Sequence, residues 1–418
     1  MALPSIDDVE HIVLSTIDQL STRSIYSFRA PLLTYVGEGA SSKLGSTLQD
    51  EAVASVLFVA DRIVHHLGLL DGAIRSCENV GIRVSVFDRV EGETCDAVVY
   101  EGIEALKKSN ADYIIGFGGG SALDAAKAIA VLADHPKSLD SIAVVGEKFK
   151  PRIGLGAVPT TAGTGSEVTD VAVILDKKNN KKVVIKHPKL IPDLAILDPN
   201  LMLAIPAPIT AATGVDTLCH AIEAYVAKDS CSLARALAAR SIRICFRWLA
   251  KCVGDGSSVY PRKKMAEASY MAGLAFSNAG LGLVHAMSHQ IGAKYHIPHG
   301  VANAIMLPPV MRFNSLVCAD AFSALAKLID LPLQGLTKLQ RSDAFITAVT
   351  NLILRLGLPA DLKSFDVCAS TFDGLAKQAI DDICILTNPR TTTCEQIVDL
   401  YRQAQVSSVN TGDHHVGI

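Results

Sequence analysis

The strongest constraint on the fold is a change in sequence pattern near the middle of the chain. From about residue 33 to residue 198, short β-branched and aromatic runs such as Val56–Ala60 and Tyr113–Phe117 alternate with helical segments. Strands separated by helices favour a parallel sheet covered by helices. Beyond residue 207 these runs vanish. Apolar residues then recur at helical spacing in residues 211–227, 233–252, 263–278, 282–294 and 395–404. The sequence therefore predicts an α/β domain with a parallel sheet, followed by an all-α domain.

Composition narrows the class of protein. A length of 418 residues predicts two or three domains, and 49% hydrophobic with 19% charged residues indicates large cores rather than disorder. The net charge of -3 gives no electrostatic reason to expect nucleic acid or an anionic membrane as a partner. Ten cysteines without a CxxC pair favour reduced thiols in a cytosol. No apolar run approaches the ~20 residues that span a bilayer, so we expect a soluble intracellular protein.

Two loops in the first half suit a dinucleotide. Gly118–Ser121 lies between the strand Tyr113–Phe117 and a helix, an arrangement that aims free backbone N–H groups at a pyrophosphate. Ser121 is the predicted N-cap of that helix. The next predicted strand, residues 153–158, ends in the hydroxyl-rich loop Pro159–Glu167. One glycine turn can be a plain strand–helix connection, and this one lacks the GxGxxG fingerprint. Two such loops after neighbouring strands favour dinucleotide binding.

Asp61 allows two interpretations. It ends the strand Val56–Ala60 and precedes a helix predicted through Leu70. Its carboxylate can bind a ribose 2′-hydroxyl and repel a 2′-phosphate, which would favour NAD over NADP. It can equally cap the helix that follows.

Residues that can bind a metal recur in the helical half. Asp216 and His220 are four apart, so they lie on one face of a helix. His285 and His289 are also one helical turn apart, and His299 follows a predicted helix break at a proline. Three imidazoles and one carboxylate suit Fe(II) or Zn(II), and poorly suit Mg or Ca. A single Asp/His pair is often a surface contact, but two clusters in one chain favour a metal site that acts as a Lewis acid.

Together these segments resemble the iron-containing (group III) alcohol dehydrogenase family over roughly residues 27–405. The matching stretches are Gly118–Ser121 with Asp124 and Lys127, Pro159–Glu167, Gly214–Asp216 with His220, Gly280–Gly282 with His285 and His289, and Pro298–Gly300 with Ala302 and Asn303. Within the family the chain looks most similar to the alcohol dehydrogenase of ethanolamine-utilisation systems, through Asp381–Cys384, Asn388–Arg390 and Glu395–Val398.

The resemblance implies a fold, two cofactors and roles for individual residues. The fold is similar to that of dehydroquinate synthase, with a NAD-binding domain at 27–198 and a helical metal-binding domain at 199–418. The metal, Fe(II) or Zn(II), would be held by Asp216, His220, His285 and His299. The residues expected to contact NAD are Asp61, Gly119, Gly120, Ser121, Asp124, Thr160, Thr161, Thr164 and Lys182. His289 would lie beside the metal and relay the alcohol proton, unless it is only a packed helix histidine. Relatives often carry Asn-Pro where this chain has Gly92-Glu93-Thr94, so no adenosine contact is assigned to Glu93.

The predicted function is reversible hydride transfer between NAD and a small primary alcohol or aldehyde of the ethanol and acetaldehyde type. The alternatives are a dehydrogenase for propanol or a small diol, and an NAD- and metal-dependent lyase on the same architecture. A non-catalytic scaffold would not need the four ligands. The resemblance also implies a homodimer in the cytoplasm or inside a bacterial microcompartment.

Residues 1–26 form an extension outside the dehydrogenase-like part. Within residues 1–23, the apolar residues Ile6, Val9, Ile12, Val13, Ile17 and Leu20 recur at three- and four-residue steps. This spacing predicts a short amphipathic helix. It would pack on the enzyme or at a dimer contact, or dock into a partner groove such as a microcompartment shell.

Overall fold

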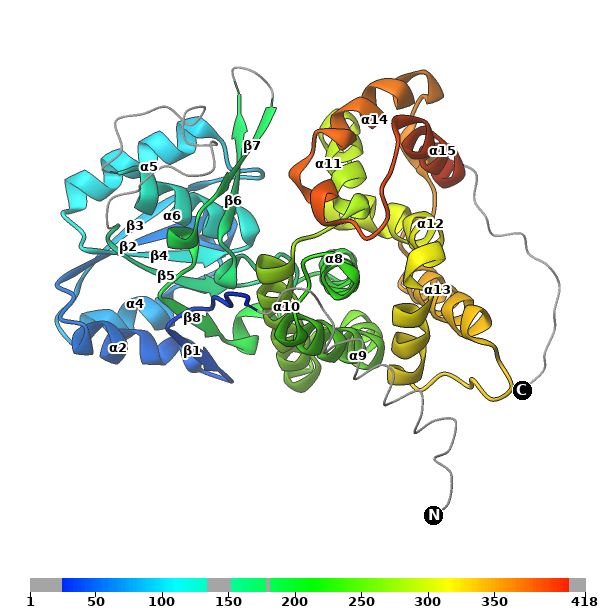
Figure 1. Ribbon diagram of the computed structural model, residues 1–418. Helices are drawn as coiled ribbons and strands as arrows, with labels where there is room; N and C mark the ends of the chain where they lie inside the picture. Colours follow the sequence, from blue (N-terminus) through cyan, green and yellow to red (C-terminus); the bar gives the residue numbers. More distant parts are fainter. Residues whose placement is uncertain (1–24, 134–151, 178–180, 406–418) are drawn as a thin grey trace, which may run out of the picture.

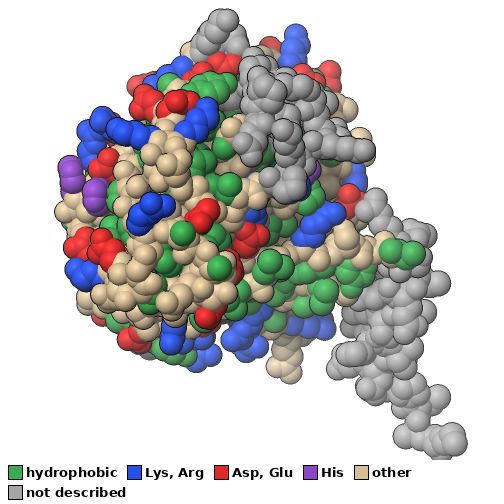
Figure 2. All heavy atoms as spheres, turned by 90° about the vertical axis from the view of Figure 1, so that its left-hand side faces the viewer, with side chains coloured by type: hydrophobic (Ala, Val, Ile, Leu, Met, Phe, Trp, Pro, Cys, Tyr) green, Lys and Arg blue, Asp and Glu red, His purple; other side chains and the backbone are tan. Residues whose placement is uncertain are grey.

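The computed structural model describes residues 25–133, 152–177 and 181–405. An α/β domain and a helical domain lie side by side, with the first helices of the helical domain between the sheet and the C-terminal helices (Figure 1). The amphipathic helix predicted over residues 1–23 lies outside the described residues. Figure 2 shows the α/β end of the molecule, where acidic and basic side chains are interspersed with hydrophobic ones.

The α/β domain is built on a parallel sheet of six strands in the order β1-β8-β5-β4-β2-β3. The strands are β1 (Leu33–Val36), β2 (Ser55–Asp61), β3 (Arg83–Val90), β4 (Tyr113–Gly118), β5 (Gly154–Pro159) and β8 (Leu194–Leu197). Helices cover both faces, with α2 (Leu44–Asp50), α3 (Arg62–His66) and α4 (Asp71–Glu78) before β3, and α5 (Asp96–Ser109) and α6 (Gly120–Leu132) after it. The predicted parallel sheet is confirmed.

Alternation along β2 explains why helices cover both faces. Leu57 and Val59 pack into the core under α5 and α6, whereas Phe58 and Ala60 pack into the core over α2 and α4. Successive side chains of a strand point to opposite faces, so a strand buried on both sides reads as one continuous apolar run. The carboxyl ends of β2, β4 and β5 consequently meet at one edge, where the two predicted nucleotide loops begin.

Two local predictions were wrong. The helix expected from Asp61 through Leu70 ends at His66, because Gly68 adopts the left-handed conformation (φ 69°) and a new helix begins at Asp71. Helix α6 begins at Gly120 with Gly119 as its N-cap and no side-chain cap. Ser121 is therefore inside the first turn of the helix rather than at its cap.

A feature that the sequence did not reveal is the antiparallel hairpin of β6 (Val171–Asp176) and β7 (Lys181–Lys186). Its residues alternate between buried and half-buried positions along β6. One face packs Ala172 and Ile174 into the core of the α/β domain. The hairpin stands at the side of the sheet that faces the helical domain (Figure 1).

The helical domain contains eight helices in the described part of the chain. They are α8 (Ala207–Val226), α9 (Ser232–Gly254), α10 (Val259–Ala279), α11 (Leu283–Tyr295), α12 (His299–Leu328), α13 (Lys338–Arg355), α14 (Phe372–Ile380) and α15 (Cys394–Gln405). Short 3-10 turns join them, among them η2 (Ser166–Val168) and η4 (Pro199–Met202) near the domain junction and η7 (Ile383–Thr387) near the C-terminus. The five helices predicted from spacing are all present, and the predicted break before His299 is confirmed because Pro298 is the N-cap of α12.

Helix α12 was not predicted, because Pro308 and Pro309 lie inside it. Of the helices that the structure describes, it alone is long and apolar enough to cross a membrane by length and composition. However, 67% of its most apolar window is buried inside the protein. It is therefore a core helix of the helical domain, and its first residue reaches the domain junction.

Candidate metal centre and cofactor cleft

The four predicted metal ligands converge where three helices meet. Asp216 and His220 lie one turn apart on α8, His285 lies in the first turn of α11, and His299 opens α12. Asp216 Oδ1 lies 3.7 Å from the Nε2 atoms of His220 and His285. It lies 3.5 Å from Nε2 of His299. Side chains from helices distant in sequence thus present one ligand atom each to a common point.

The spacing of these atoms fits one divalent ion. Four-coordinate bonds of about 2.1 Å place neighbouring ligand atoms about 3.4 Å apart in a tetrahedron, close to the observed separations. All four ligand atoms lie within 4.8 Å of one another. Three of the residues are buried, whereas the His299 side chain is 37% exposed. Three imidazoles and one carboxylate form a donor set for Fe(II) or Zn(II), reachable from the side of His299.

Burial and mutual charge set the protonation of the cluster. Burial lowers the pKa of His220 to about 4, and it also lowers the pKa of His299 well below its usual value. Burial alone would raise the pKa of Asp216, but the histidines around it hold that pKa far below its usual range. The imidazoles of His220 and His299 are thus neutral beside an ionised carboxylate, and they carry the lone pairs that a metal ion needs. Burial would lower the pKa of His285 as well, but contact with Cys219 and the nearby carboxylates raises it well above its usual value. The Nε2 proton of His285 therefore has to leave when an ion binds.

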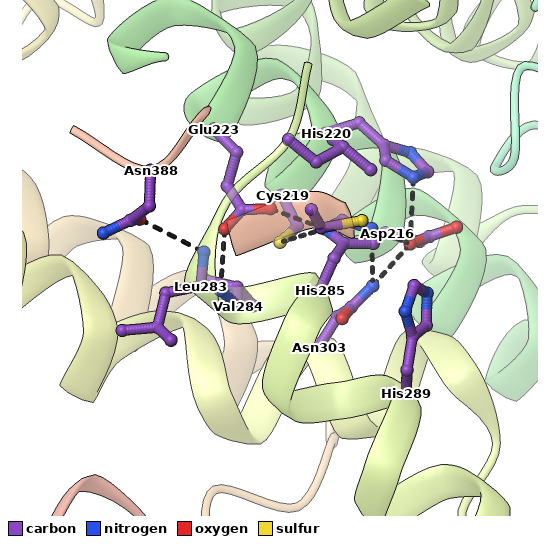
Figure 3. Close-up of polar contacts among 12 residues, drawn as sticks. Asp216, Cys219, His220, Glu223, Leu283, Val284, His285, His289, Asn303 and Asn388 are labelled. Atoms are coloured by element: carbon purple, nitrogen blue, oxygen red, sulfur yellow. Dashed lines mark hydrogen bonds and ion pairs between the residues drawn. The ribbon is translucent and has the colours of Figure 1, made fainter. Parts of the chain in front are cut away.

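Glu223 supports His285 on the side away from the other ligands (Figure 3). Its Oε2 atom lies 2.6 Å from His285 Nδ1, and its Oε1 atom accepts the backbone N–H of Val284 at 2.7 Å. The Nδ1 proton is thereby directed to the carboxylate, and Nε2 is left for the metal position. Such carboxylates fix the tautomer and orientation of ligating histidines. Glu223 is not among the residues predicted from the sequence, although it lies on α8 seven residues after Asp216, on the same helix face.

Asn303 also contacts the predicted metal ligands, although no role was predicted for it from the sequence. Its amide Nδ2 lies 2.7 Å from Asp216 Oδ1, 3.1 Å from His299 Nε2 and 3.2 Å from His285 Nε2. The side chain is fully buried one turn into α12. A donor at this point holds the Asp216 carboxylate in place before any ion arrives.

His289 lies beside the metal cluster and outside it. Its ring stacks on that of His299 with centroids 5.4 Å apart, and its Nδ1 atom lies 2.8 Å from Asp382 Oδ2. Burial would raise the pKa of Asp382, but the hydrogen bond and charge of His289 lower it. Asp382 is therefore a carboxylate, and it accepts the Nδ1 proton of His289. The Nε2 atom lies on the opposite side of the ring, away from this hydrogen bond.

The two predicted nucleotide loops lie against each other at the carboxyl edge of the sheet. The N–H of Thr160 donates to the carbonyl of Gly118 at 2.9 Å. A Cβ atom at Gly120 would lie 2.7 Å from the Thr164 methyl group, so glycine is required for this close approach. Gly119 faces the side chain of Thr161. The loops thus form one continuous backbone surface, as their order after neighbouring strands predicted.

This surface is anchored by groups that were assigned to NAD. Both oxygens of Asp124 accept hydrogen bonds from the protein, one from Ser166 Oγ at 2.6 Å and one from the N–H of Val173 at 2.9 Å. The carbonyl of Ser121 accepts the hydroxyl of Thr94 at 2.5 Å. Asp124 thus links α6 to η2 and β6 through hydrogen bonds, and these contacts hold the two loops in position.

Asp61 caps α3. Its Oδ1 atom accepts the N–H groups of Ile63 at 2.7 Å and Val64 at 3.3 Å. The interpretation of Asp61 as a helix cap is therefore confirmed. Only one carboxylate oxygen makes these bonds, so the other remains available to a ribose. Asp61 also lies beside the glycine turn, because a Cβ atom at Gly118 would lie 3.8 Å from the Asp61 nitrogen.

A cavity of about 550 Å³ opens between the two domains next to the metal cluster. The residues that line it include Glu93 and Lys182 from the α/β domain and Gln290, His296 and His299 from the helical domain. Lys182 Nζ pairs with Glu93 Oε1 at 2.5 Å across its edge. The predicted NAD residue Lys182 and the predicted ligand His299 therefore share one cavity.

Comparison with known sequences places the chain in a family. The sequence pattern described as iron-containing alcohol dehydrogenase matches residues 31–199, and the C-terminal pattern of the Fe-containing alcohol dehydrogenase family matches residues 210–405. The chain belongs to the iron-containing alcohol dehydrogenase family. Family membership and the two-domain fold, both expected from the sequence, are confirmed.

Individual members of the family cover nearly the whole chain. A probable alcohol dehydrogenase, EutG, of Escherichia coli K12 is 40% identical over 96% of this chain and 100% of its own length. The NAD-dependent methanol dehydrogenase of Bacillus methanolicus is 35% identical over 90% of this chain and 99% of its own length. A crystal structure of 1,3-propanediol oxidoreductase superposes with a TM-score of 0.89 at 36% identity, covering 91% of this chain and all of the other. This iron-containing alcohol dehydrogenase is thus an oxidoreductase that interconverts alcohols and aldehydes with NAD.

Proposed function

We propose that the chain oxidises small primary alcohols and reduces small aldehydes of the ethanol and acetaldehyde type, with iron(II) held by Asp216, His220, His285 and His299. The observation that supports this most strongly is the convergence of one carboxylate and three imidazoles beside an interdomain cavity. When bound there, the metal supplies Lewis acidity to a substrate oxygen. Zn(II) fits the same donors.

The residues around the proposed metal would prepare the site. Glu223 holds the His285 ring so that its Nε2 atom faces Asp216. Asn303 holds the Asp216 carboxylate. Because these partners are already in place, binding an ion requires little rearrangement of the ligands.

We propose that the pyrophosphate of NAD binds to the surface formed by Gly119, Gly120, Ser121 and the loop from Thr160 to Thr164. NAD supplies the hydride acceptor or donor, and its chemistry belongs to the cofactor. Free N–H groups at the start of α6 suit phosphate oxygens. The second oxygen of Asp61 would accept a ribose hydroxyl, and Lys182 would lie beside the cofactor in the cavity. Asp124 would position the loops.

His289 is proposed to move the alcohol proton. In its neutral form, an imidazole that donates a hydrogen bond from Nδ1 to Asp382 can accept a proton at Nε2. The His289 side chain is 24% exposed, so a proton received there can pass on to solvent. Its stacking on His299 puts it next to the metal cluster.

The substrate proposal rests on the relatives, which are named for methanol and 1,3-propanediol. A substrate and metal matrix on anaerobically purified protein tests it. Dialysed protein is loaded with Fe(II), Zn(II) or Co(II) and assayed with methanol, ethanol, propanol and 1,3-propanediol and the corresponding aldehydes. Highest kcat/KM for ethanol or acetaldehyde with Fe(II) supports the proposal. A preference for the diol or for propanol would replace that substrate. The absence of turnover of every one of these alcohols and aldehydes would contradict the substrate proposal.

A homodimer is part of the proposal. Strand β1 is an edge of the six-stranded sheet, and Leu32, Leu33 and Val36 beside it are exposed. An exposed apolar edge strand is a surface that a second chain can cover. Sedimentation equilibrium of the wild type and of Leu33→Lys tests this directly. A monomeric wild type contradicts it.

Location inside a bacterial microcompartment is proposed from the similarity to EutG and from residues 1–23. Fusion of residues 1–23 to a fluorescent protein should direct it into co-expressed shells, whereas an enzyme that lacks them should stay active and diffuse in the cytoplasm. Diffuse fluorescence of the fusion, or loss of stability on truncation, would give the segment a structural role.

A further inference from the structure

A second group of ligand-type side chains lies next to the four-residue metal cluster. We propose that His289, Asp382 and Cys384 form a separate, inhibitory site for a thiophilic divalent cation such as Zn(II). The His289 nitrogen, the Asp382 oxygen and the Cys384 sulfur all lie within 4.8 Å of one another. None of the three belongs to the first cluster, whose four ligands can bind an ion without them.

The group is held together by its own hydrogen bonds. Asp382 is the N-cap of η7, and its Oδ1 atom accepts the N–H of Cys384 at 2.9 Å. One tight turn therefore carries both the carboxylate and the thiol. Gln290 Nε2 lies 3.2 Å from Asp382 Oδ2, next to His289 on α11. Two elements more than ninety residues apart in sequence thus fix three ligands in place before any ion binds.

The donor set selects the class of ion. A thiolate, an imidazole and a carboxylate suit Zn(II) and similar soft ions, whereas Mg and Ca prefer oxygen ligands throughout. His289 Nδ1 and Asp382 Oδ2 are 2.8 Å apart. Bonds of about 2.0–2.1 Å need them about 3.3 Å apart in a tetrahedron, so a small outward movement is sufficient. The side chains of His289 and Asp382 are 24% and 12% exposed, and Cys384 is half-buried, so the ion can enter.

Binding changes the protons in a defined way. The Cys384 thiol loses its proton to solvent and becomes the thiolate ligand. The Nδ1 atom of His289 exchanges its proton for the metal, and the neutral ring keeps one proton at Nε2. One proton is released in total. Burial and the nearby Asp382 raise the pKa of Cys384 well above its usual value, so this site binds more weakly than the first.

The consequence for catalysis follows from the tautomer. With metal on Nδ1 and a proton on Nε2, His289 has no lone pair with which to accept the alcohol proton. Excess Zn(II) would then stop turnover while the iron stays in place. Only this loss of turnover rests on the relay role proposed for His289, since the binding of a second ion does not depend on it.

The test uses iron-loaded enzyme, because iron and zinc can be counted separately. Iron-loaded wild type is titrated with Zn(II) under anaerobic conditions, bound iron and zinc are measured after equilibrium dialysis, and the initial rate is followed in parallel. We expect one zinc per chain to bind without loss of iron, turnover to fall as it binds, and a weak chelator to restore the rate. Cys384→Ser should weaken zinc binding by at least the ~10–100-fold typical of losing even an indirect partner of a ligand. It should also resist inhibition.

Matched variants keep the result interpretable. Cys394→Ser removes another half-buried cysteine outside the group and should behave like the wild type. Asp382→Asn should weaken zinc binding as Cys384→Ser does, with folding checked by circular dichroism. Unchanged zinc binding in both Cys384→Ser and Asp382→Asn would overturn the second site. Inhibition accompanied by release of iron would place the zinc in the first cluster instead. Zinc bound at this site with full turnover would overturn its inhibitory role and the relay role of His289.

Discussion

The Oε2 atom of Glu223 lies 2.6 Å from Nδ1 of His285, and both side chains are buried. A hydrogen bond to a buried carboxylate is short and strong because the acceptor is charged. It holds the Nδ1 proton on the side of α8, so the opposite nitrogen is available at the point where the proposed ligands meet. The metal centre thus depends on a residue that itself binds no metal.

Glu223→Gln should disrupt this arrangement with little change in volume. The amide cannot accept from both Val284 N–H and His285 Nδ1–H, so it presents a donor to one of them. We expect metal affinity to fall by ~10–100-fold, measured by competition with a chromophoric chelator. Glu267→Gln, which breaks an ion pair with Lys264 on α10, is the matched control. Equal metal affinity in Glu223→Gln and the wild type would show that the carboxylate has no part in the site.

His289→Ala should separate proton transfer from metal binding. Since His289 lies outside the four-residue cluster, the variant should retain its metal and bind NAD. Turnover should fall by the ~10²–10⁴-fold typical of general acid–base groups. Metal analysis and steady-state kinetics on the same sample check both statements. Loss of metal in this variant would make His289 a ligand.

Asp61 offers a test that distinguishes charge from capping. The wild type should prefer NADH strongly to NADPH. Asn is as good an N-cap as Asp, so Asp61→Asn keeps the cap of α3 and removes the repulsion of a 2′-phosphate. Both Asp61→Asn and Asp61→Gly should improve kcat/KM for NADPH relative to NADH. An unchanged ratio in both variants would leave Asp61 as a helix cap alone.

Metal binding should also stabilise the fold. A ligand at about 100 times its Kd raises the free energy of unfolding by ~2.7 kcal/mol when only the native state binds it. We therefore expect protein loaded with Fe(II) under anaerobic conditions to unfold at higher urea concentration than chelator-treated protein. The difference should vanish in His220→Ala. The same stabilisation in that variant would mean that the ion binds elsewhere.

Much of the fold and the proposed ligand set could be predicted from the sequence, because both depend on spacing. Asp216 and His220 share a helix face by being four residues apart, and Pro298 breaks the helix before His299. Alternating buried strands and glycine turns likewise indicated the sheet and its loops. These features depend on residues close together in the sequence, so they can be recognised without a structure.

The residues that support the proposed ligands and His289 were harder to predict from the sequence. Asp382 reaches His289 only because η7 packs against α11, and no local pattern marks that contact. Glu223 was detectable by its position on the face of Asp216, but a helix glutamate is more often solvated than buried. Ser121 is not the cap because α6 starts two residues earlier than a helix capped by Ser121 would, at Gly120, which passes close to Thr164.

The most direct test of the proposed metal centre is the iron content and turnover of His285→Ala and His299→Ala, purified without oxygen beside the wild type. His296→Asn is the matched control, because His296 lines the cavity outside the cluster and Asn tolerates its left-handed backbone (φ 54°). We expect one iron per chain and ethanol-dependent NADH formation in the wild type and the control, and neither in the two alanine variants, with circular dichroism unchanged. Full iron occupancy in either alanine variant would contradict the proposed metal centre.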